Sequence, residues 1–229
     1  YVDSGSYALN KIISGKYDGG FPIGGITEIY GESSTAKTVF LTHAFVGAQK
    51  KGYYTVMVDN EHAYSPSFAN ILGVDSEKLI YTTPETMEGC FEAIENSILA
   101  IREHDKDTPI VIGYDSIGVS PTRKEMDGEL GANGEIPGAL KVGLVFGDPR
   151  TKAGGGKALL YYCAVSLETA SAKAGIMFDE LKNPTGIKGT VKCVKNKVTV
   201  PYQDCEFKLE YNKGLSQDYG LTTSAYRNG

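Results

Sequence analysis

One eight-residue segment constrains this chain more than any other part of its sequence. Gly31-Glu32-Ser33-Ser34-Thr35-Ala36-Lys37-Thr38 matches the phosphate-binding pattern G-x-x-x-x-G-K-[ST], with Ala36 in place of the second glycine. The apolar run 26–30 predicts a strand before it, and apolar residues at helical spacing over 37–49 predict a helix after it. A strand, a loop of small residues and a helix in this order favour a nucleotide-binding α/β fold.

The loop would bind phosphate mainly through its backbone. Successive N–H groups form a concave nest for phosphate oxygens, and the helix that follows adds the positive end of its dipole. Lys37 would neutralise the β- and γ-phosphates, and the Thr38 hydroxyl would ligate Mg²⁺. We therefore expect ATP and Mg²⁺ as cofactors.

Ala36 is the position where the motif departs from its pattern. If the backbone there has a positive φ, an alanine costs about 1–2 kcal/mol relative to glycine. If φ is negative, the cost is small and the nest is preserved. The alternative interpretation of the whole segment is a Ser/Thr-rich N-cap in front of an ordinary helix.

Two carboxylates follow neighbouring predicted strands. Asp115 ends the apolar run 109–114, where it could hold the Mg²⁺ shell through water. Glu61 follows the run 53–58, where it could orient and activate the attacking water. Each acid alone is equally well explained as a helix cap or a solvated loop residue. Together with the phosphate loop, at three strand ends of one parallel sheet, they predict an active site.

The remaining pattern divides the chain into two halves. In the first half, strands alternate with helices, which is typical of a parallel sheet covered on both faces. The second half predicts two glycine-rich loops, 128–138 and 143–156, and three strands, 158–168, 191–200 and 205–211, of which the last two are antiparallel. The first half also includes a predicted helix at 66–72, a strand at 79–82 and a helix at 84–103. The fold class is therefore α/β, with a mixed, mainly parallel sheet and helices on both faces.

Composition limits the class of protein. The 229 residues, 41% of them apolar, suit one globular domain, and a net charge of −5 argues against a generally basic nucleic-acid coat but leaves room for a local basic patch. No run of 18 apolar residues and no signal-peptide pattern occurs, so we expect no membrane partner. The four cysteines form no C-x-x-C pair, and the histidines have no metal-ligand spacing. We expect buried free thiols and a cytoplasmic location, the host cytoplasm if a phage encodes the chain.

Four stretches resemble RecA-type recombinases, with a phage version among the candidates. They are 26–38, 58–75, 141–168 and 190–214, and the last contains V-K-N-K followed by proline and E-F, which is more specific than a phosphate loop alone. The resemblance implies a RecA-like ATPase core over 1–214, with 215–229 a remnant of the C-terminal region. It also implies an ATP-dependent DNA recombinase that forms a helical filament with itself on single-stranded DNA and pairs it with a duplex.

The resemblance assigns roles to particular residues. Glu61 and Lys37 would be catalytic, and Phe68 would sit against the adenine bound by its own subunit. Lys195 and Lys197 would reach the γ-phosphate of a neighbouring subunit, and Tyr211 would flank that neighbour's adenine. From the residues alone, the two lysines are better explained as solvated protectors of an edge strand.

The resemblance also places DNA-binding residues in the two glycine-rich loops. Flexible glycines let backbone N–H groups approach phosphates, basic side chains add local charge, and an aromatic ring can wedge between bases. The residues are Gly128, Glu129, Leu130 and Gly131 in the first loop, and Phe146, Arg150, Lys152, Gly154, Gly155 and Lys157 in the second.

Rival functions and one departure remain open. The rivals are a RecA-fold motor ATPase, as in a helicase-like or clock-type ring, and a nucleotide-dependent DNA-binding scaffold with weak hydrolysis.

The departure lies at Leu140-Lys141-Val142, where the family has a helix and a core strand that cannot fit here. Without that strand, its neighbours would keep unpaired backbone groups. We expect either that residues near 140 or 220 are not covalently adjacent, so that their Cα atoms lie farther apart than about 3.8 Å, or that the chain is genuinely rearranged.

Overall fold

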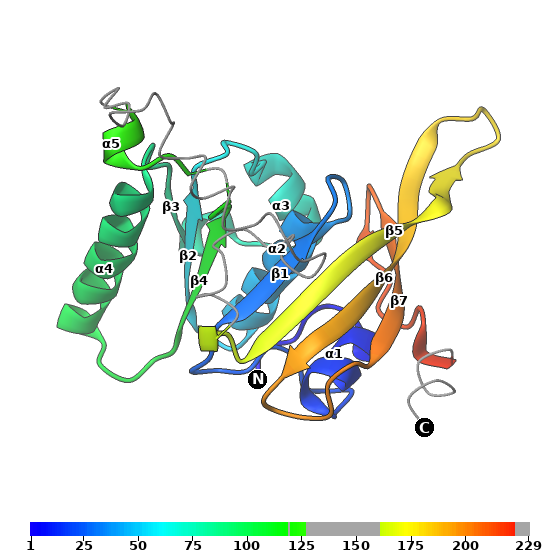
Figure 1. The fold of residues 1–229 in the computed structure, drawn as a ribbon, viewed down its shortest axis with the longest axis horizontal. Helices are drawn as coiled ribbons and strands as arrows, with labels where there is room; N and C mark the ends of the chain where they lie inside the picture. Colours follow the sequence, from blue (N-terminus) through cyan, green and yellow to red (C-terminus); the bar gives the residue numbers. More distant parts are fainter. Residues whose placement is uncertain (119, 127–160, 223–229) are drawn as a thin grey trace, which may run out of the picture.

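The structure, a computed structural model, describes residues 1–118, 120–126 and 161–222. The strands of this part form two sheets, one of three strands in the order β3-β2-β4 and one of five in the order β1-β5-β6-β7-β8 (Figure 1). Helices cover both sheets, so the α/β class is confirmed.

The three-stranded sheet is parallel throughout. Its strands are β2 (Tyr54–Asp59), β3 (Leu79–Thr82) and β4 (Ile110–Asp115). Helix α4 (Met87–His104) packs on one face, and α2 (Lys37–Lys50) and α3 (Pro66–Leu72) pack on the other. Because helices cover both faces, five consecutive residues of β2 are buried, and the strand is a continuous apolar run ending in Asp59.

The five-stranded sheet is mostly antiparallel. It contains β1 (Thr27–Gly31), β5 (Val165–Phe178), β6 (Pro184–Asn196), β7 (Asp204–Glu210) and β8 (Gly214–Leu215). Only β1 and β5 run parallel. Helix α1 (Tyr7–Ser14) packs against β6 and β7, and its apolar residues join those of α2 and the sheet in the largest core cluster.

Helix α2 connects the two sheets. Its Phe40 meets Phe207 of β7 edge-on, with ring centroids 5.1 Å apart. On its other side Leu41 and Phe45 lie so close to Gly113 of β4 that a Cβ there would clash with both. The helix is therefore packed against both sheets.

Sequence reasoning was wrong about the bounds of two strands in the second half, and it missed one helix in the first. The strand predicted at 158–168 begins at Val165 and continues to Phe178, and β6 begins at Pro184 rather than at 191. Helix α1 was not predicted. The two long strands form a hairpin that projects beyond the sheet (Figure 1), where the arms pair mainly with each other, so side-chain burial leaves no alternating pattern to detect.

A further short helix, α5 (Arg123–Met126), and a 3₁₀ turn (Ser76–Lys78) complete the described elements.

All four cysteines are buried and free, as expected. Within the described residues no cluster of His, Cys, Asp or Glu has the arrangement of a metal site. No helix in that part of the chain is long and apolar enough to cross a membrane.

The expected single sheet is interrupted between β1 and β4. Among the described residues, β1 pairs only with β5, and β4 pairs only with β2. Residues 127–160, which include the junction near Leu140, lie outside the described part, so the expected jump in Cα spacing there is not tested. The proposed boundary at 214 stays a prediction, although Leu215 is buried in the core.

Candidate nucleotide-binding site

The segment between β1 and α2 forms a tight loop held on β5. Gly31 has φ 151°, and a Cβ there would lie 2.2 Å from the Thr169 carbonyl oxygen, so only glycine fits. The buried Thr35 hydroxyl lies 2.8 Å from the Glu32 carbonyl oxygen, to which it donates, and 2.7 Å from the Thr169 hydroxyl. These contacts fix the loop from both of its ends.

Ala36 adopts the left-handed conformation, with φ 67° and ψ 19°. Of the two cases considered for this position, the one with a cost of about 1–2 kcal/mol therefore applies. Ala36 is also the N-cap of α2, and no side chain caps the helix there. Helices α1, α3 and α4 each have a side-chain cap, from Ser6, Ser65 and Thr86 respectively. The interpretation of the motif as an ordinary N-cap is therefore wrong.

The side chains that follow the loop point to its mouth. Lys37 Nζ donates to the carbonyl oxygens of Gly31, at 3.1 Å, and Glu32, at 2.6 Å. Thr38 Oγ1 donates to Asp115 Oδ2 at 2.6 Å. This hydrogen bond joins the loop, which belongs to the five-stranded sheet, to the end of β4 in the other sheet.

The Asp115 carboxylate lies partly buried and close to other negative charges. Burial raises its pKa, the hydrogen bond from Thr38 lowers it, and the negative charges of Glu61 and Asp59 raise it further, against an opposing effect of Lys37. Two further carboxylates and one lysine thus act on the Asp115 carboxylate. The mouth of the loop has an excess of negative charge that a cation would offset.

Glu61 completes the group predicted from the three strand ends. Its Oε1 accepts a hydrogen bond from Ser116 Oγ at 2.7 Å. One pocket is lined by loop residues 33–39 together with Glu61, Asp115 and Ser116. The structure therefore brings Lys37, Thr38, Asp115 and Glu61 together, although they come from separate parts of the sequence.

Sequence reasoning missed the residue that holds the Glu61 segment in place. Asp59 is fully buried at the end of β2 and accepts hydrogen bonds from the backbone N–H groups of Ala63 and Tyr64, at 3.3 and 3.0 Å, and from Tyr81 Oη at 2.9 Å. An acid directly after an apolar strand was the available signal. Ser116 and Thr169 were also missed, and nothing in their sequence context marks them.

The residues present fit a magnesium–nucleoside triphosphate. An uncapped helix N-terminus and a nest of N–H groups suit phosphate oxygens. The Thr38 hydroxyl and the Asp115 carboxylate are the hard oxygen donors that Mg²⁺ prefers, and they already lie within hydrogen-bond distance of each other. Lys37 would move from its backbone acceptors to a phosphate.

Lys195 and Lys197 lie far from this pocket within the same chain. Both Nζ atoms donate to the Tyr161 carbonyl oxygen, at 3.3 and 3.2 Å. In the register, Thr27 pairs with Val165 and Val165 with Asn196, whereas Gly31 pairs with Thr169. The lysines therefore sit at the opposite end of β1 from the loop, about 13 Å away along the strand. At Lys195, β6 pairs with β5 through Ser166, whereas its pairing with β7 ends at Lys192, so the explanation of the two lysines as edge protectors stays open.

Phe68 and Tyr211 lie on the loop side of the molecule. Phe68 is on α3 and packs against the main core cluster. Tyr211 directly follows β7, and its N–H donates to the Thr185 carbonyl at the start of β6. A Cβ on nearby Gly214 would touch Leu72, so this turn lies against α3. The predicted DNA-binding residues, from Gly128 to Lys157, all lie outside the described part of the chain.

Comparison with known proteins settles the family. The model of the RecA N-terminal domain matches residues 1–137 and 138–216, which is nearly the whole chain. The chain belongs to the RecA family. Its fold, its nucleotide-binding character and a general role in DNA recombination follow from that membership.

Individual relatives agree with this assignment. The RecA protein of Kineococcus radiotolerans is 34% identical over 256 residues, which covers 100% of this chain and 70% of the relative. The RecA protein of Chlorobium chlorochromatii is 34% identical over 246 residues, covering 94% of this chain and 65% of the relative. The chain thus spans about two thirds of the length of these RecA proteins.

A solved structure supports the fold alone. The crystal structure of the RadB recombinase matches with a TM-score of 0.63 at 16% identity, covering 95% of this chain and 99% of that one.

The alignment with the Kineococcus RecA protein also shows a difference in length. It runs over 256 positions with the Kineococcus protein, although this chain has 229 residues, so at least 27 positions of the relative have no counterpart here.

Proposed function

We propose that this RecA-family protein is an ATP-dependent DNA recombinase, which forms filaments on single-stranded DNA, pairs that strand with a homologous duplex and hydrolyses ATP in response to DNA. The observation that carries the proposal is the pocket where Lys37, Thr38, Asp115 and Glu61 meet around an uncapped helix N-terminus. On a RecA fold this arrangement suits phosphoryl transfer to water. The partners would be single- and double-stranded DNA and further copies of the chain.

The pocket would work mainly by positioning and charge neutralisation. The loop N–H groups and Lys37 hold the phosphates, and Thr38 with Asp115 would hold Mg²⁺, which supplies charge neutralisation at the reacting phosphate. The Ser116 hydroxyl occupies one oxygen of Glu61, so the other oxygen is left to orient a water molecule and accept its proton. Lys37 and Glu61 are therefore the residues we assign to catalysis.

We assign Lys195 and Lys197 to the nucleotide that is bound by a neighbouring subunit. Their place at the far end of β1 keeps them out of their own pocket, which supports action across an interface. ATP bound between subunits would then be contacted by Lys37 of one chain and by Lys195 and Lys197 of the next. Nucleotide state would control filament geometry through these contacts.

The register changes the role proposed for Tyr211. Glu210 pairs with Gly186, and Gly186 is nine residues from Lys195 along β6, or about 30 Å. One neighbour could not bring both Tyr211 and Lys195 to the same nucleotide. Because the turn that holds Tyr211 lies against α3, which carries Phe68, we reassign Tyr211 to the adenine bound by its own subunit.

A mixing experiment tests the interface. Lys195→Ala should spare ATP binding by an isolated subunit but lose DNA-stimulated hydrolysis, and Glu61→Gln should lose hydrolysis in its own pocket. In an equal mixture, about a quarter of head-to-tail interfaces pair an intact Glu61 with an intact lysine. Hydrolysis should therefore reappear on mixing. Lys192→Ala, an exposed lysine on the same strand, is the matched control and should hydrolyse ATP normally.

Other results would identify a different function. No recovery at any mixing ratio would mean that the lysines act within their own subunit or not at all. A closed ring of fixed subunit number in electron micrographs, instead of a filament on single-stranded DNA, would favour the motor ATPase. ATP binding without measurable turnover would favour the scaffold.

A further inference from the structure

The segment that carries Glu61 is anchored on both of its sides. After Glu61, two backbone N–H groups donate to the buried Asp59 carboxylate, as described above. Before Glu61, the Asn60 N–H donates to the Asp115 carbonyl oxygen at 3.0 Å, which extends the pairing of β2 with β4 by one residue. The Glu61 side chain itself is exposed. Its position therefore depends on these anchors and on its hydrogen bond with Ser116, and not on close packing.

The backbone between the two anchors is strained. His62, directly after Glu61, has φ 55°, which lies in the left-handed region that residues other than glycine rarely adopt. Such a conformation persists only where the surrounding contacts maintain it. Loss of one anchor would thus let the segment relax and would displace Glu61.

One buried hydroxyl connects the Asn60 side chain to the end of β4. Ser120 is only 1% exposed, and its Oγ lies 2.5 Å from Asn60 Nδ2 and 2.5 Å from Tyr114 Oη. The same oxygen donates to the Ser116 carbonyl at 3.1 Å. Because a hydroxyl has a single proton and a carbonyl can only accept, Asn60 and Tyr114 both donate to Ser120.

These contacts close a ring that includes Glu61. Ser116 Oγ donates to Glu61 Oε1 at 2.7 Å, while the Ser116 carbonyl accepts from Ser120. Ser120 in turn accepts from Asn60, which directly precedes Glu61 in the chain. The same buried serine therefore supports Glu61 in two ways, through the residue that bonds its carboxylate and through its own backbone.

The residues that follow Ser120 are attached to α4. The Pro121 carbonyl accepts from the Met87 N–H at 2.8 Å, and the Arg123 N–H donates to Glu88 Oε2 at 3.0 Å. Helix α4 packs on the three-stranded sheet, from which the Glu61 segment also emerges. Ser120 is thus held in a fixed place relative to β2 and β4.

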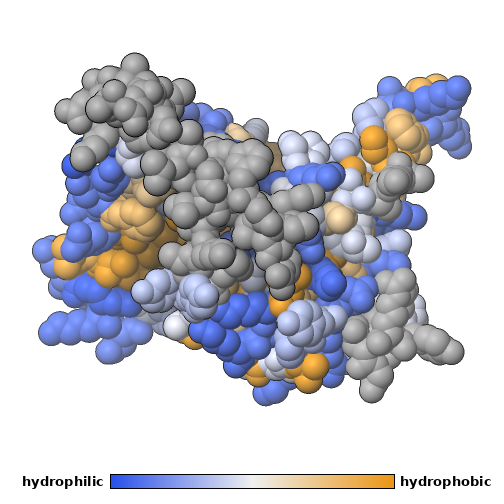
Figure 2. All heavy atoms as spheres, viewed as in Figure 1, coloured by the Kyte–Doolittle hydropathy of each residue, from blue (hydrophilic) through white to orange (hydrophobic). Residues whose placement is uncertain are grey.

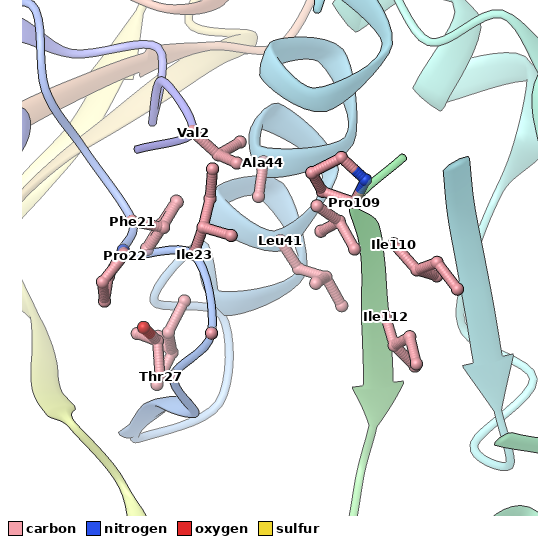
Figure 3. A pocket seen from close by; sticks show the side chains of 14 residues that line it. Val2, Phe21, Pro22, Ile23, Thr27, Leu41, Ala44, Pro109, Ile110 and Ile112 are labelled. Atoms are coloured by element: carbon pink, nitrogen blue, oxygen red, sulfur yellow. The ribbon is translucent and has the colours of Figure 1, made fainter. Parts of the chain in front are cut away.

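The polar cluster is confined to the carboxyl end of β4. At the amino end, Ile110 and Ile112 line an apolar pocket together with Leu41 of α2 (Figure 3). Polar groups are costly to bury, and Asn60 Oδ1 is a buried acceptor to which no group of the described residues donates. Stability alone therefore does not explain this cluster, and its contact with Glu61 points to a role in the reaction.

Given the ATP hydrolysis proposed above, on which this assignment rests, we propose that Asn60 and Ser120 are positioning residues for Glu61. The Ser120 hydroxyl fixes the Asn60 side chain and the Ser116 carbonyl, and these two place the Glu61 carboxylate where it orients the attacking water. Neither Asn60 nor Ser120 is among the described residues that line the pocket at the phosphate loop. They act on turnover and not on ATP binding.

Asn60→Ala is the cleanest variant. It removes the unpartnered Oδ1 together with Nδ2, and it leaves Ser120 bonded to Tyr114 and Ser116, so the protein should fold with little change in Tm. The rate of hydrolysis at saturating ATP and single-stranded DNA should fall about tenfold, because a small misplacement of a reacting group is costly. ATP affinity, measured by calorimetry, should stay within about twofold of wild type.

Ser120→Ala breaks the same link from the other side and should slow hydrolysis at least as much. Its matched control is Ser97→Ala. The Ser97 hydroxyl also donates to a backbone carbonyl, that of Ala93 at 2.7 Å, but it belongs to α4, where Figure 2 shows hydrophilic and apolar side chains together at the surface. The control should hydrolyse ATP at the wild-type rate.

Double variants show whether Asn60 acts through Glu61. Glu61→Gln removes the group that is positioned, so adding Asn60→Ala to it should slow single-turnover hydrolysis by less than about twofold further. Asn60→Ala combined with Ser120→Ala should be no slower than Ser120→Ala alone. A residue that only stabilised the fold would lower the rate by the same factor with or without Glu61.

Hydrogen exchange without nucleotide or DNA reports on the Glu61 segment separately from turnover. In Asn60→Ala and Ser120→Ala, amides of residues 60–64 should exchange about tenfold faster, while those of Val56 and Val58 in β2 keep wild-type rates. Unchanged exchange over 60–64 would overturn the assignment. So would equal losses of rate and ATP affinity, or a loss that adds in full to that of Glu61→Gln. If the wild-type protein hydrolyses no ATP, the proposed function fails, and exchange alone decides whether the two residues hold this segment.

Discussion

The two sheets contribute to the nucleotide site in different ways. The three-stranded sheet is parallel and covered by helices on both faces, and it supplies Glu61 and Asp115 at the carboxyl ends of its strands. The five-stranded sheet is mostly antiparallel, and it supplies the phosphate loop at one end of β1 and Lys195 with Lys197 at the other. In the proposed mechanism, the phosphate-binding loop thus comes from one sheet, and the carboxylates for Mg²⁺ and for the attacking water come from the other.

This difference separates binding from turnover. The loop and α2 should bind the triphosphate with little help from the carboxylates, whereas hydrolysis requires both sheets in register. The connections described between them at the site are α2 itself and the hydrogen bond from Thr38 to Asp115. Variants of one sheet should therefore differ in kind from variants of the other.

The largest expected effect is on turnover and comes from the three-stranded sheet. Glu61→Gln should lower DNA-stimulated ATP hydrolysis by about 10²- to 10⁴-fold, because the amide cannot accept the proton of the attacking water. ATP affinity, measured by calorimetry, should stay within about threefold of wild type, since a 1.4 kcal/mol loss would already give tenfold. Glu77→Gln, an exposed acid on a neighbouring turn, is the control. Equal losses of affinity and turnover would contradict the division of roles.

The next effect is on binding and comes from the loop. Lys37→Ala should weaken ATP binding by about 100-fold or more, because it removes the cation that forms charge-assisted hydrogen bonds with the phosphates. Lys50→Ala changes a lysine at the other end of the same helix and should leave affinity unchanged. Unchanged ATP affinity in the Lys37 variant would remove the basis for a phosphate site at this loop.

Acid should weaken the connection between α2 and the five-stranded sheet. His43 is buried, its Nε2 accepts from the Leu215 N–H at 3.2 Å, and burial lowers its pKa to about 4. A histidine whose pKa is lowered by folding stabilises the native state above its unfolded pKa of about 6.5, and that stability is lost as pH falls toward 4. We expect about 2–3 kcal/mol between these limits.

Urea unfolding at several pH values measures this contribution. Wild type should lose more free energy of unfolding between pH 7 and pH 4.5 than His43→Gln does. The carboxyls of buried Glu28 and partly buried Asp115, whose pKa values are raised, change stability in the opposite direction, but they are present in both proteins. His104→Gln is the exposed control. Parallel pH profiles for wild type and His43→Gln would show that His43 does not carry the effect.

The smallest effect concerns the strained loop residue. Ala36→Gly should stabilise the protein by about 1 kcal/mol, because glycine adopts the left-handed conformation without the cost that alanine has there. For a chain of this size that is a rise in Tm of about 2–4 °C. Ala48→Gly, in the buried interior of the same helix, should instead destabilise by about 1 kcal/mol or more. A lower Tm for Ala36→Gly would mean that the loop does not strain alanine.

Much of the site could be predicted because its chemistry is local. The phosphate loop is continuous in sequence, and Asp115 and Glu61 each follow an apolar strand closely enough to be placed at its end. Asp59 and Thr169 act only through partners that folding brings near, so no local pattern identifies them. The reassignment of Tyr211 depends on strand register, which pairing across the sheet determines and sequence spacing does not.

The fold, like the site, could be predicted only where the sequence pattern is local. Strands and helices of the first half have clear periods, and their bounds agree with the structure within a few residues. The projecting β5–β6 hairpin buries little of its outer arms, so it leaves no apolar alternation in the sequence. A missing strand was expected near Leu140, but that junction lies outside the described residues, so the expectation stays a prediction.

ATP hydrolysis with and without single-stranded DNA tests the central claim most directly. The account predicts a slow basal rate that rises several-fold with circular single-stranded DNA and is absent in Lys37→Ala and Glu61→Gln at equal protein concentration. A rate that DNA does not change, or that persists in both variants, would contradict a nucleotide site assembled from both sheets and coupled to DNA.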